Sequence, residues 1–188
     1  ETDPLHKVSI IPRGAHALGY TMQLPIEDRY TMSRRELMAR MTVMMGGRVA
    51  EELVFSEITT GAQNDLETAT AMARRMVCEF GMSERLGSLT YGKRERQMFL
   101  GRDLFEERNY SEQTAVLIDE EVRRLIDTAY ERARQALLTH RAQLDRLAQT
   151  LLEKEVLDGE EVKQLVGPIT APAAPEPAPP AGNNRTTA

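Results

Sequence analysis

The chain has 188 residues, a formal net charge of -5 and 41% hydrophobic residues, which is an ordinary composition for a globular protein. The acidic balance, without any basic cluster, argues against nucleic-acid binding. A single cysteine, Cys78, excludes an intrachain disulfide, and no apolar run reaches the roughly 18 residues that span a bilayer. We therefore expect a soluble fragment. Because it begins at Glu1 without a methionine, we also expect it to be part of a longer polypeptide.

Two short extended runs near the N-terminus predict a β-hairpin. Residues 7–11 and 17–24 are rich in strand-forming side chains, each run is followed by a proline, and residues 13–16 supply the turn. An isolated hairpin is marginally stable in water. We therefore expect further strands to join it, some of them upstream of Glu1.

A capping-box pattern opens the first predicted helix, where Ser33 and Glu36 can satisfy each other's free N–H groups. Methionines dominate the apolar stripe of this helix, which we interpret as core packing; the stripe is Met38, Met41, Met45, Val49 and Leu53. The glycine pair at 46–47 suggests that another backbone approaches closely there. Glu51 and Glu52 follow, and they could be either a solvated face or metal ligands.

The central stretch, residues 60–70, opens a helix that should run to about Phe80. Its apolar residues recur at helical spacing and should face a core; they are Ala69, Met72, Ala73, Met76 and Phe80. Asp65 extends this stripe by one turn, so we expect its carboxylate to point inward. An inward carboxylate must be paired or bound to a cation, whereas an acid in a first helical turn is also stabilised by the helix dipole alone. Both interpretations of Asp65 stay open on spacing alone.

The rest of the chain predicts a helical layer. Residues 82–110 show no helical period and should form a long loop. Ser111 should cap the longest helix, followed by a helix at 141–154 and a short one from Leu157 to about Val166. From Pro168 the composition predicts a disordered Pro/Ala-rich tail, residues 168–188. The fold class is therefore mainly α with a small N-terminal β-hairpin, in one domain of residues 1–167.

Several motifs occur together in the order and spacing of one family. They lie at residues 8–14 (VSIIPRG), 17–20 (ALGY), 46–52 (GGRVAEE), 60–66 (TGAQNDL), 81–87 (GMSERLG) and 99–102 (FLGR). Over about residues 1–167, the chain resembles the peptidase domain of FtsH-type, membrane-anchored AAA+ zinc metalloproteases.

The resemblance implies a helical peptidase domain from a homohexameric, ATP-driven protease that processively degrades membrane and soluble proteins. The family's zinc is held by two histidines of a His-Glu-x-x-His helix and by a downstream aspartate, which corresponds here to Asp65. Glu51 and Glu52 are then not ligands. ATP would bind outside this chain, and an N-terminal segment absent from it would anchor the protein at the cytoplasmic side of the bacterial inner membrane.

One departure from the family concerns the metal site. The three histidines are His6, His16 and His140; none precedes a glutamate, and no two are four residues apart. The catalytic glutamate and both histidine ligands are therefore missing, and we expect an incomplete zinc site and an inactive chain. If the missing helix normally packs against Met41, Met45 and Met72, that surface should be exposed.

The run Ala17-Leu18-Gly19-Tyr20 is a candidate substrate-binding edge. An extended peptide could add there as a strand, and Gly19 would let its backbone approach closely. An ordinary interior strand is the alternative. For the whole chain, two other interpretations stay open: a protease-dead helical module that serves ring assembly, or an unrelated domain in which Asp65 is a helix-start acid. A His-Glu-x-x-His motif upstream of Glu1 would favour the protease.

Overall fold

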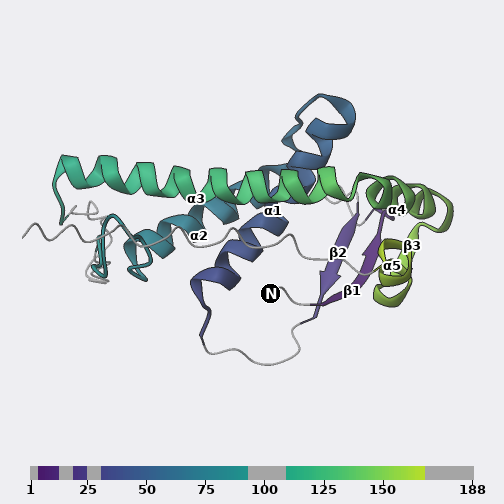
Figure 1. The fold of residues 1–188 in the computed structure, drawn as a ribbon, viewed down its shortest axis with the longest axis horizontal. Coiled ribbons are helices and arrows are strands. Elements are labelled where there is room, and N and C mark those ends of the chain that lie inside the picture. Colours follow the sequence, from purple (N-terminus) through teal and green to yellow (C-terminus); the bar gives the residue numbers. More distant parts are fainter. Residues whose placement is uncertain (1–3, 13–18, 25–30, 93–108, 168–188) are drawn as a thin grey trace, which may run out of the picture.

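The computed structural model describes residues 4–12, 19–24, 31–92 and 109–167. Three helices form what we call the helical body: α1 (Arg34–Phe55), α2 (Gln63–Cys78) and α3 (Glu112–Thr139). The terminal lobe contains a three-stranded sheet, α4 (Arg141–Lys154) and α5 (Gly159–Val166). Figure 1 shows the terminal lobe at one end of the long α3. The prediction of a mainly helical fold with a small N-terminal hairpin is confirmed.

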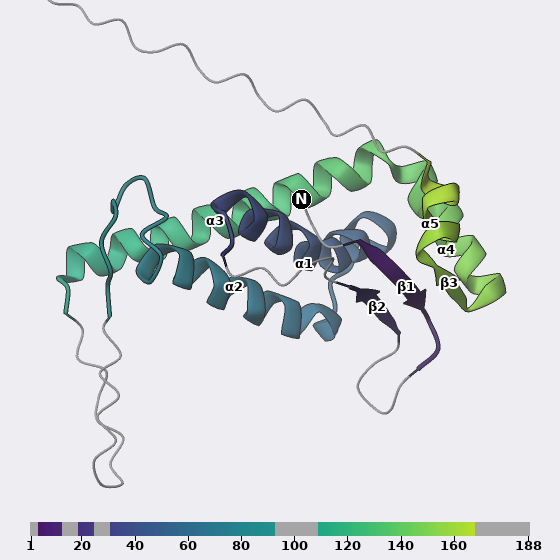
Figure 2. The same cartoon turned by 90° about the horizontal axis from the view of Figure 1, so that it is seen from below.

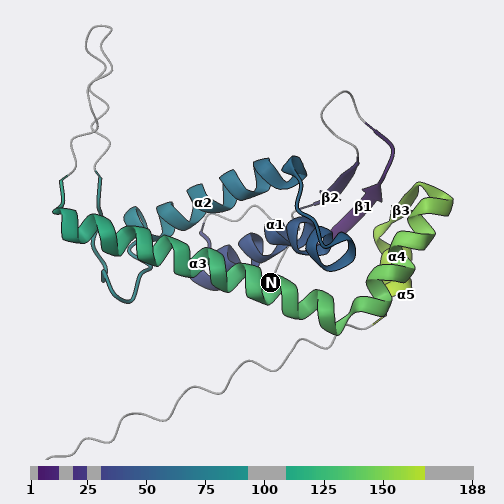
Figure 3. The same ribbon diagram turned by 90° about the horizontal axis from the view of Figure 1, so that it is seen from above.

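Helix α1 begins at the predicted capping box and forms the centre of the core. The Glu36 N–H donates to Ser33 Oγ at 3.2 Å, and the Ser33 N–H donates to Glu36 Oε2 at 2.8 Å. Met41, Met45 and Val49 are fully buried in the core that α1 forms with α2 and α3. The expected exposure of Met41 and Met45 is therefore wrong, because helices of this same chain cover them. Figures 2 and 3 show α1 and α2 on the same side of α3.

The glycine pair in α1 does not mark a close approach within the described residues. Apart from the adjacent residues and the nearby backbone of α1 itself, a Cβ built on Gly46 or Gly47 would meet no described atom within 4 Å. The prediction that another backbone lies against this pair is wrong for the described part of the chain. Gly46 and Gly47 instead leave the backbone of α1 uncovered by side chains at these two positions.

Helix α2 follows a short 3-10 turn, η1 (Thr60–Ala62), and ends slightly earlier than predicted. Gly81 lies just past its end with a φ of +60°, a conformation that favours glycine. The buried face consists of Ala69, Ala73, Met76 and Val77. Phe80 is 43% exposed, so the buried face of α2 ends at Val77 and does not include Phe80 as predicted.

The sheet has the strand order β2-β1-β3 and joins both ends of the described chain. Strands β1 (Leu5–Ser9) and β2 (Tyr20–Gln23) form the predicted hairpin, and β3 (Val156–Asp158) pairs antiparallel with the other side of β1. The third strand therefore comes from downstream, where the sequence predicted only the start of a helix. Asp158 serves both purposes, since it ends β3 and forms a capping box with Glu161 at the start of α5.

The terminal lobe has its own small core, separate from that of the helical body. Leu151, Leu157 and Val162 are its buried members, and Leu5 and Val8 of β1 pack against them. Among the described elements, the main contact between the lobe and the body is the one between α3 and α4. The predicted tail, residues 168–188, and most of the predicted loop at 82–110 lie outside the described residues.

Candidate functional site

Asp65 is the acidic residue in the first turn of α2. Its side chain is exposed, and it makes no hydrogen bond or ion pair with another described residue. Ala62, at the N-cap position, provides no side-chain cap. The carboxylate therefore projects from a helix N-terminus with its oxygens accessible, which suits either a dipole-stabilised acid or a metal ligand.

The prediction that Asp65 points into the core is wrong for the described chain. The core face of α2 continues towards its N-terminus through half-buried Leu66 and buried Ala62. These two residues keep the i, i+3, i+4 spacing with Ala69 and Ala73, so Asp65 lies on the flank of the buried face. The apolar stripe could continue towards the N-terminus through either Asp65 or Leu66. The spacing of the stripe could not distinguish the two, because these residues are neighbours in the same turn.

The end of α1 holds the turn that leads into α2. Glu51 accepts two hydrogen bonds from Thr59, one from its hydroxyl at 2.8 Å and one from its backbone N–H at 3.1 Å. Arg48 Nη1 donates to the Thr59 carbonyl at 3.0 Å. The Thr59 N–H and then its hydroxyl lower the pKa of Glu51. Glu51 is therefore committed to positioning the loop before Asp65, a role that neither sequence alternative had assigned to it.

The two residues after Glu51 tie the same end of α1 to α3 and α4. The Tyr130 hydroxyl of α3 donates a hydrogen bond to Glu52 Oε2. This bond stabilises the neutral phenol beside a carboxylate and raises the pKa of Tyr130. Arg141 Nη1, at the start of α4, donates to the Leu53 carbonyl at 3.1 Å. Residues 51–53 thus connect η1, α3 and α4 at one point.

An open groove of about 700 Å³ runs along the face of α2 that carries Asp65. Thr68, Met72 and Arg75 follow Asp65 at i+3, i+7 and i+10, so they lie on that same face. The groove is lined by Thr31, Met32, Leu37, Arg40, Thr68, Ala71, Met72, Arg75, Phe80 and Met82. The Arg75 guanidinium stacks 5.0 Å from the Phe80 ring centre, at the α2 C-terminal end of the groove. Met72 is half-buried and packs against the core, so the expected exposed surface is not found at this residue either.

The described residues do not bring a set of metal ligands together around Asp65. Within the described ranges, no group of three or more histidine, cysteine, aspartate or glutamate side chains could hold a metal ion. His6 is exposed on β1, and His140 lies between α3 and α4. His16 lies outside the described residues. Asp65 can therefore supply one carboxylate ligand, and any further ligands would come from elsewhere.

The candidate substrate edge is only partly described. Gly19 and Tyr20 are described, whereas Ala17 and Leu18 are not. β2, which begins at Tyr20, has β1 as its one neighbour among the described strands. A Cβ on Gly19 would lie 2.6 Å from the Ser9 carbonyl oxygen. The absence of a side chain at Gly19 thus already serves the hairpin itself.

Comparisons with known proteins decide the family. Residues 1–165 match the family model described as Peptidase family M41. The chain belongs to peptidase family M41. The predicted resemblance to FtsH-type zinc metalloproteases is thereby confirmed.

Several curated relatives are similar to this M41 chain over most of its length. An "ATP-dependent zinc metalloprotease FtsH" of Pseudothermotoga lettingae is 55% identical over 164 residues, which cover 87% of this chain and 26% of the relative. "ATP-dependent zinc metalloprotease FtsH 3" of Symbiobacterium thermophilum is 54% identical over 177 residues, covering 94% and 28%. The chain thus spans about a quarter of the length of these relatives. Among its described helices, none has the length and apolar character to cross a membrane.

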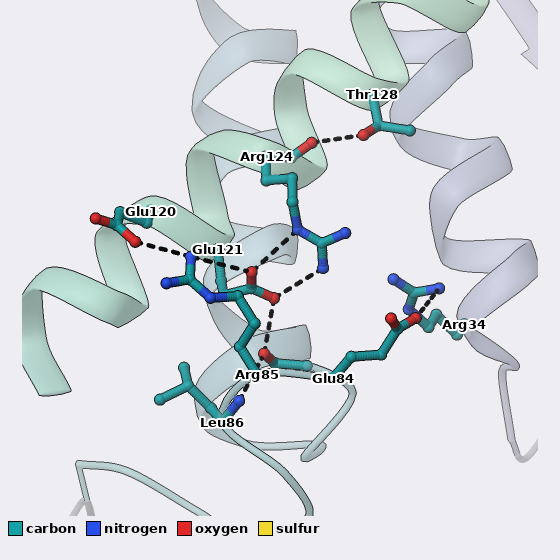
Figure 4. Close-up of polar contacts among 9 residues, drawn as sticks. Arg34, Glu84, Arg85, Leu86, Glu120, Glu121, Arg124 and Thr128 are labelled. Carbon is teal, nitrogen blue, oxygen red and sulfur yellow. Dashed lines mark hydrogen bonds and ion pairs between the residues drawn. The ribbon is translucent and has the colours of Figure 1, made fainter. Parts of the chain in front are cut away.

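The M41 domain also contains a buried ionic cluster that the sequence did not reveal. The Glu121 side chain in α3 is 1% exposed, and it accepts hydrogen bonds from Arg124 Nε at 3.0 Å, Arg124 Nη2 at 2.8 Å and Ser83 Oγ at 2.7 Å. Figure 4 shows Arg85 reaching the same carboxylate from the turn after α2. Arg124 is the main cause that lowers the pKa of Glu121. The sequence indicates this cluster only weakly. Glu121 is one of two adjacent glutamates, and only its position on the helix surface distinguishes the buried Glu121 from the exposed Glu120.

Proposed function

We propose that the chain forms part of the peptidase domain of an ATP-dependent zinc metalloendopeptidase. The support is the M41 match over residues 1–165, together with relatives more than half identical that are named as ATP-dependent zinc metalloproteases. The expected substrates are membrane and soluble proteins. Peptide-bond hydrolysis of unfolded chains suits a site that offers main-chain contacts beside a metal.

In this proposal Asp65 is a zinc ligand. Its exposed carboxylate has no partner among the described residues, and Glu51 and Thr59 fix the turn that presents it. Asp65 fits a site in which the two histidines and the catalytic glutamate come from sequence outside this chain. Zinc, when bound, supplies the Lewis acid that polarises the scissile carbonyl. The expectation that the chain alone is inactive stays a prediction.

Substitution of Asp65 tests this assignment. In the full-length protein, Asp65→Asn should reduce bound zinc per subunit well below one and lower proteolysis by at least about tenfold, the usual order for loss of a metal ligand or its support. Zinc is measured by mass spectrometry of the purified protein, so the result does not depend on activity alone. Asp127→Asn, at another exposed aspartate without a described partner, is the matched control.

Unchanged zinc and unchanged proteolysis in Asp65→Asn would overturn the assignment. That outcome would leave Asp65 as a helix-start acid. A full-length protein that binds no zinc even with Asp65 intact would instead favour the protease-dead module that serves ring assembly.

The substrate edge at Ala17, Leu18, Gly19 and Tyr20 belongs to the same proposal. Edge strands carry main-chain groups that an extended peptide can pair with irrespective of its sequence. β2 extends this edge beyond Tyr20, and the exposed Met22 in β2 and Leu24 just after it offer apolar contact to a bound chain.

Assembly and location are also proposed from the family. We expect a homohexamer with its ATP bound outside this chain, attached at the cytoplasmic side of the bacterial inner membrane through an N-terminal segment that is not part of this sequence. Protein substrates are the expected partners, and nucleic acid is not.

A further inference from the structure

The substrate edge and Asp65 lie in different parts of the molecule. The described part of the edge continues from Tyr20 along β2 in the terminal lobe, whereas Asp65 lies on α2 in the helical body. A peptide that pairs with β2 must reach a metal held by Asp65, so cleavage requires a fixed orientation between the two parts. Figures 1 and 3 show that the helical body and the terminal lobe meet where α3 ends and α4 begins.

The junction between α3 and α4 is short. α3 ends at Thr139, α4 begins at Arg141, and His140 between them has φ -110° and ψ 28°. His140 takes part in one backbone hydrogen bond with each helix: its N–H donates to the Ala136 carbonyl of α3, and its carbonyl accepts the Leu144 N–H of α4, each at 3.0 Å. These bonds continue each helix but leave the angle between the helices to side chains.

Arg141 is the side chain that connects this junction to the helical body. Its Nη1 donates to the Leu53 carbonyl in the last turn of α1 at 3.1 Å, and its Nε donates to Asp145 Oδ1 at 2.9 Å. Carbonyls in the last turn of a helix lack helical partners and favour a nearby cation. The last turn of α1 contains no basic residue of its own, so Arg141 supplies that cation from α4.

The place where Arg141 attaches matters for the site. Leu53 follows Glu51 by two residues, and Glu51 holds Thr59 in the loop that leads to Asp65. Arg141 therefore fastens the lobe to the same helix end that positions the Asp65 turn. The Tyr130 bond to Glu52 is adjacent but lies wholly within the body, where α1 and α3 are already packed together.

We propose that Arg141 is a positioning residue, which fixes the β2 edge relative to Asp65 so that a substrate can engage both. The inference rests on the proposed function. Loss of Arg141 should widen the range of angles between α3 and α4, which weakens productive substrate binding and leaves the metal ligand intact.

Kinetics of the full-length protease provide the first test. For an extended peptide substrate, Arg141→Met should raise KM by about three- to tenfold, the size expected for the loss of one typical hydrogen bond, with kcat within about twofold. Arg141→Lys keeps a cation near the Leu53 carbonyl and should recover part of the loss. Bound zinc per subunit should be unchanged in both variants.

Tyr130→Phe is the matched control. It removes one hydrogen bond to the neighbouring residue Glu52 without touching the junction, so KM should stay within about twofold of wild type. An unchanged KM in Arg141→Met, or an equal rise in Tyr130→Phe, would overturn the proposal.

A distance measurement tests the same inference without relying on activity. Spin labels at Thr21 on β2 and Glu67 on α2, with Cys78 replaced by serine and labelled subunits diluted into unlabelled protein, report the separation of lobe and body. Arg141→Met should broaden the distance distribution, and an unchanged width would overturn the proposal. Failure of the proposed function is a separate result, because it would appear in the wild-type protein as the absence of zinc-dependent cleavage.

Discussion

At the scale of single residues, Glu121 is a carboxylate that is tolerable inside the protein only because its partners surround it. A buried charge without partners is strongly unfavourable, but Arg124 and Ser83 occupy both oxygens of Glu121. Ser83 Oγ in turn accepts the Leu86 N–H at 3.2 Å. The cluster therefore fixes the turn after α2 onto α3.

Replacing this charge should cost stability. Glu121→Gln should lower the free energy of unfolding by about 2 kcal/mol, because it removes charge-assisted hydrogen bonds from a buried position. Glu120→Gln, which affects an exposed ion pair with Arg85, should cost less than about 1 kcal/mol. Urea denaturation compares the two, and equal losses would contradict the burial argument.

The lowered pKa of Glu121 also predicts how the free energy of unfolding depends on pH. The pKa of folded Glu121 lies below its ordinary value of 4.5, so its stabilisation is complete above that pH. The stabilisation is lost as the pH falls from 4.5 through the lowered pKa of the folded state. The unfolding free energy of Glu121→Gln should therefore depend less on pH than that of wild type in this acidic range.

At the scale of elements, glycines in the lobe and in the body have opposite structural roles. A Cβ on Gly159 would lie 2.1 Å from the Leu5 carbonyl oxygen, so β1 and the start of α5 can pack only without it. Gly47, inside α1, has open space where a Cβ would be. One glycine is required by a contact, whereas the other only weakens its helix.

Alanine substitutions should separate these roles. Gly159→Ala should destabilise the fold by about 1–3 kcal/mol, since backbone must shift to admit the methyl group. Gly47→Ala should stabilise it by up to about 1 kcal/mol through better helix propensity. Thermal unfolding followed by circular dichroism measures both changes. A stabilised Gly159→Ala would show that β1 and α5 are less closely packed than described.

At the scale of the whole molecule, the open edge of β2 determines which main-chain groups can pair with a substrate that extends from the terminal lobe to the helical body. The Leu24 N–H donates inward to the Pro4 carbonyl at 3.3 Å, and alternate residues of a strand point their main-chain groups to opposite sides. Thr21 and Gln23 should therefore present their main-chain groups outward. A peptide bound there would pair with β2 through alternate residues of the strand.

N-methylated substrates test this pairing in the full-length protease. Methyl groups on alternate amides that face β2 should raise KM by about fivefold for each hydrogen bond lost. Methylation of the intervening amides, which face away, is the control and should leave KM nearly unchanged. Equal effects of both patterns would contradict strand addition at β2.

Local chemistry made much of this protein predictable from the sequence. The capping box at Ser33, the buried methionine face of α1, the helix after Ser111 and the family itself all follow from patterns within short stretches. These features depend on spacing and on bonds between residues a few positions apart. The prediction of Asp65 as a candidate ligand likewise follows from its place in a motif at a helix start.

Only the tertiary structure decided which distant segments meet. It exposed Asp65 by continuing the core face through Leu66, paired β3 from the end of the described chain with β1 from its start, and placed Arg141 against the end of α1. Periodicity reports that a residue lies near one face of its own helix, but the partner that covers this face is chosen by the packing of the whole chain.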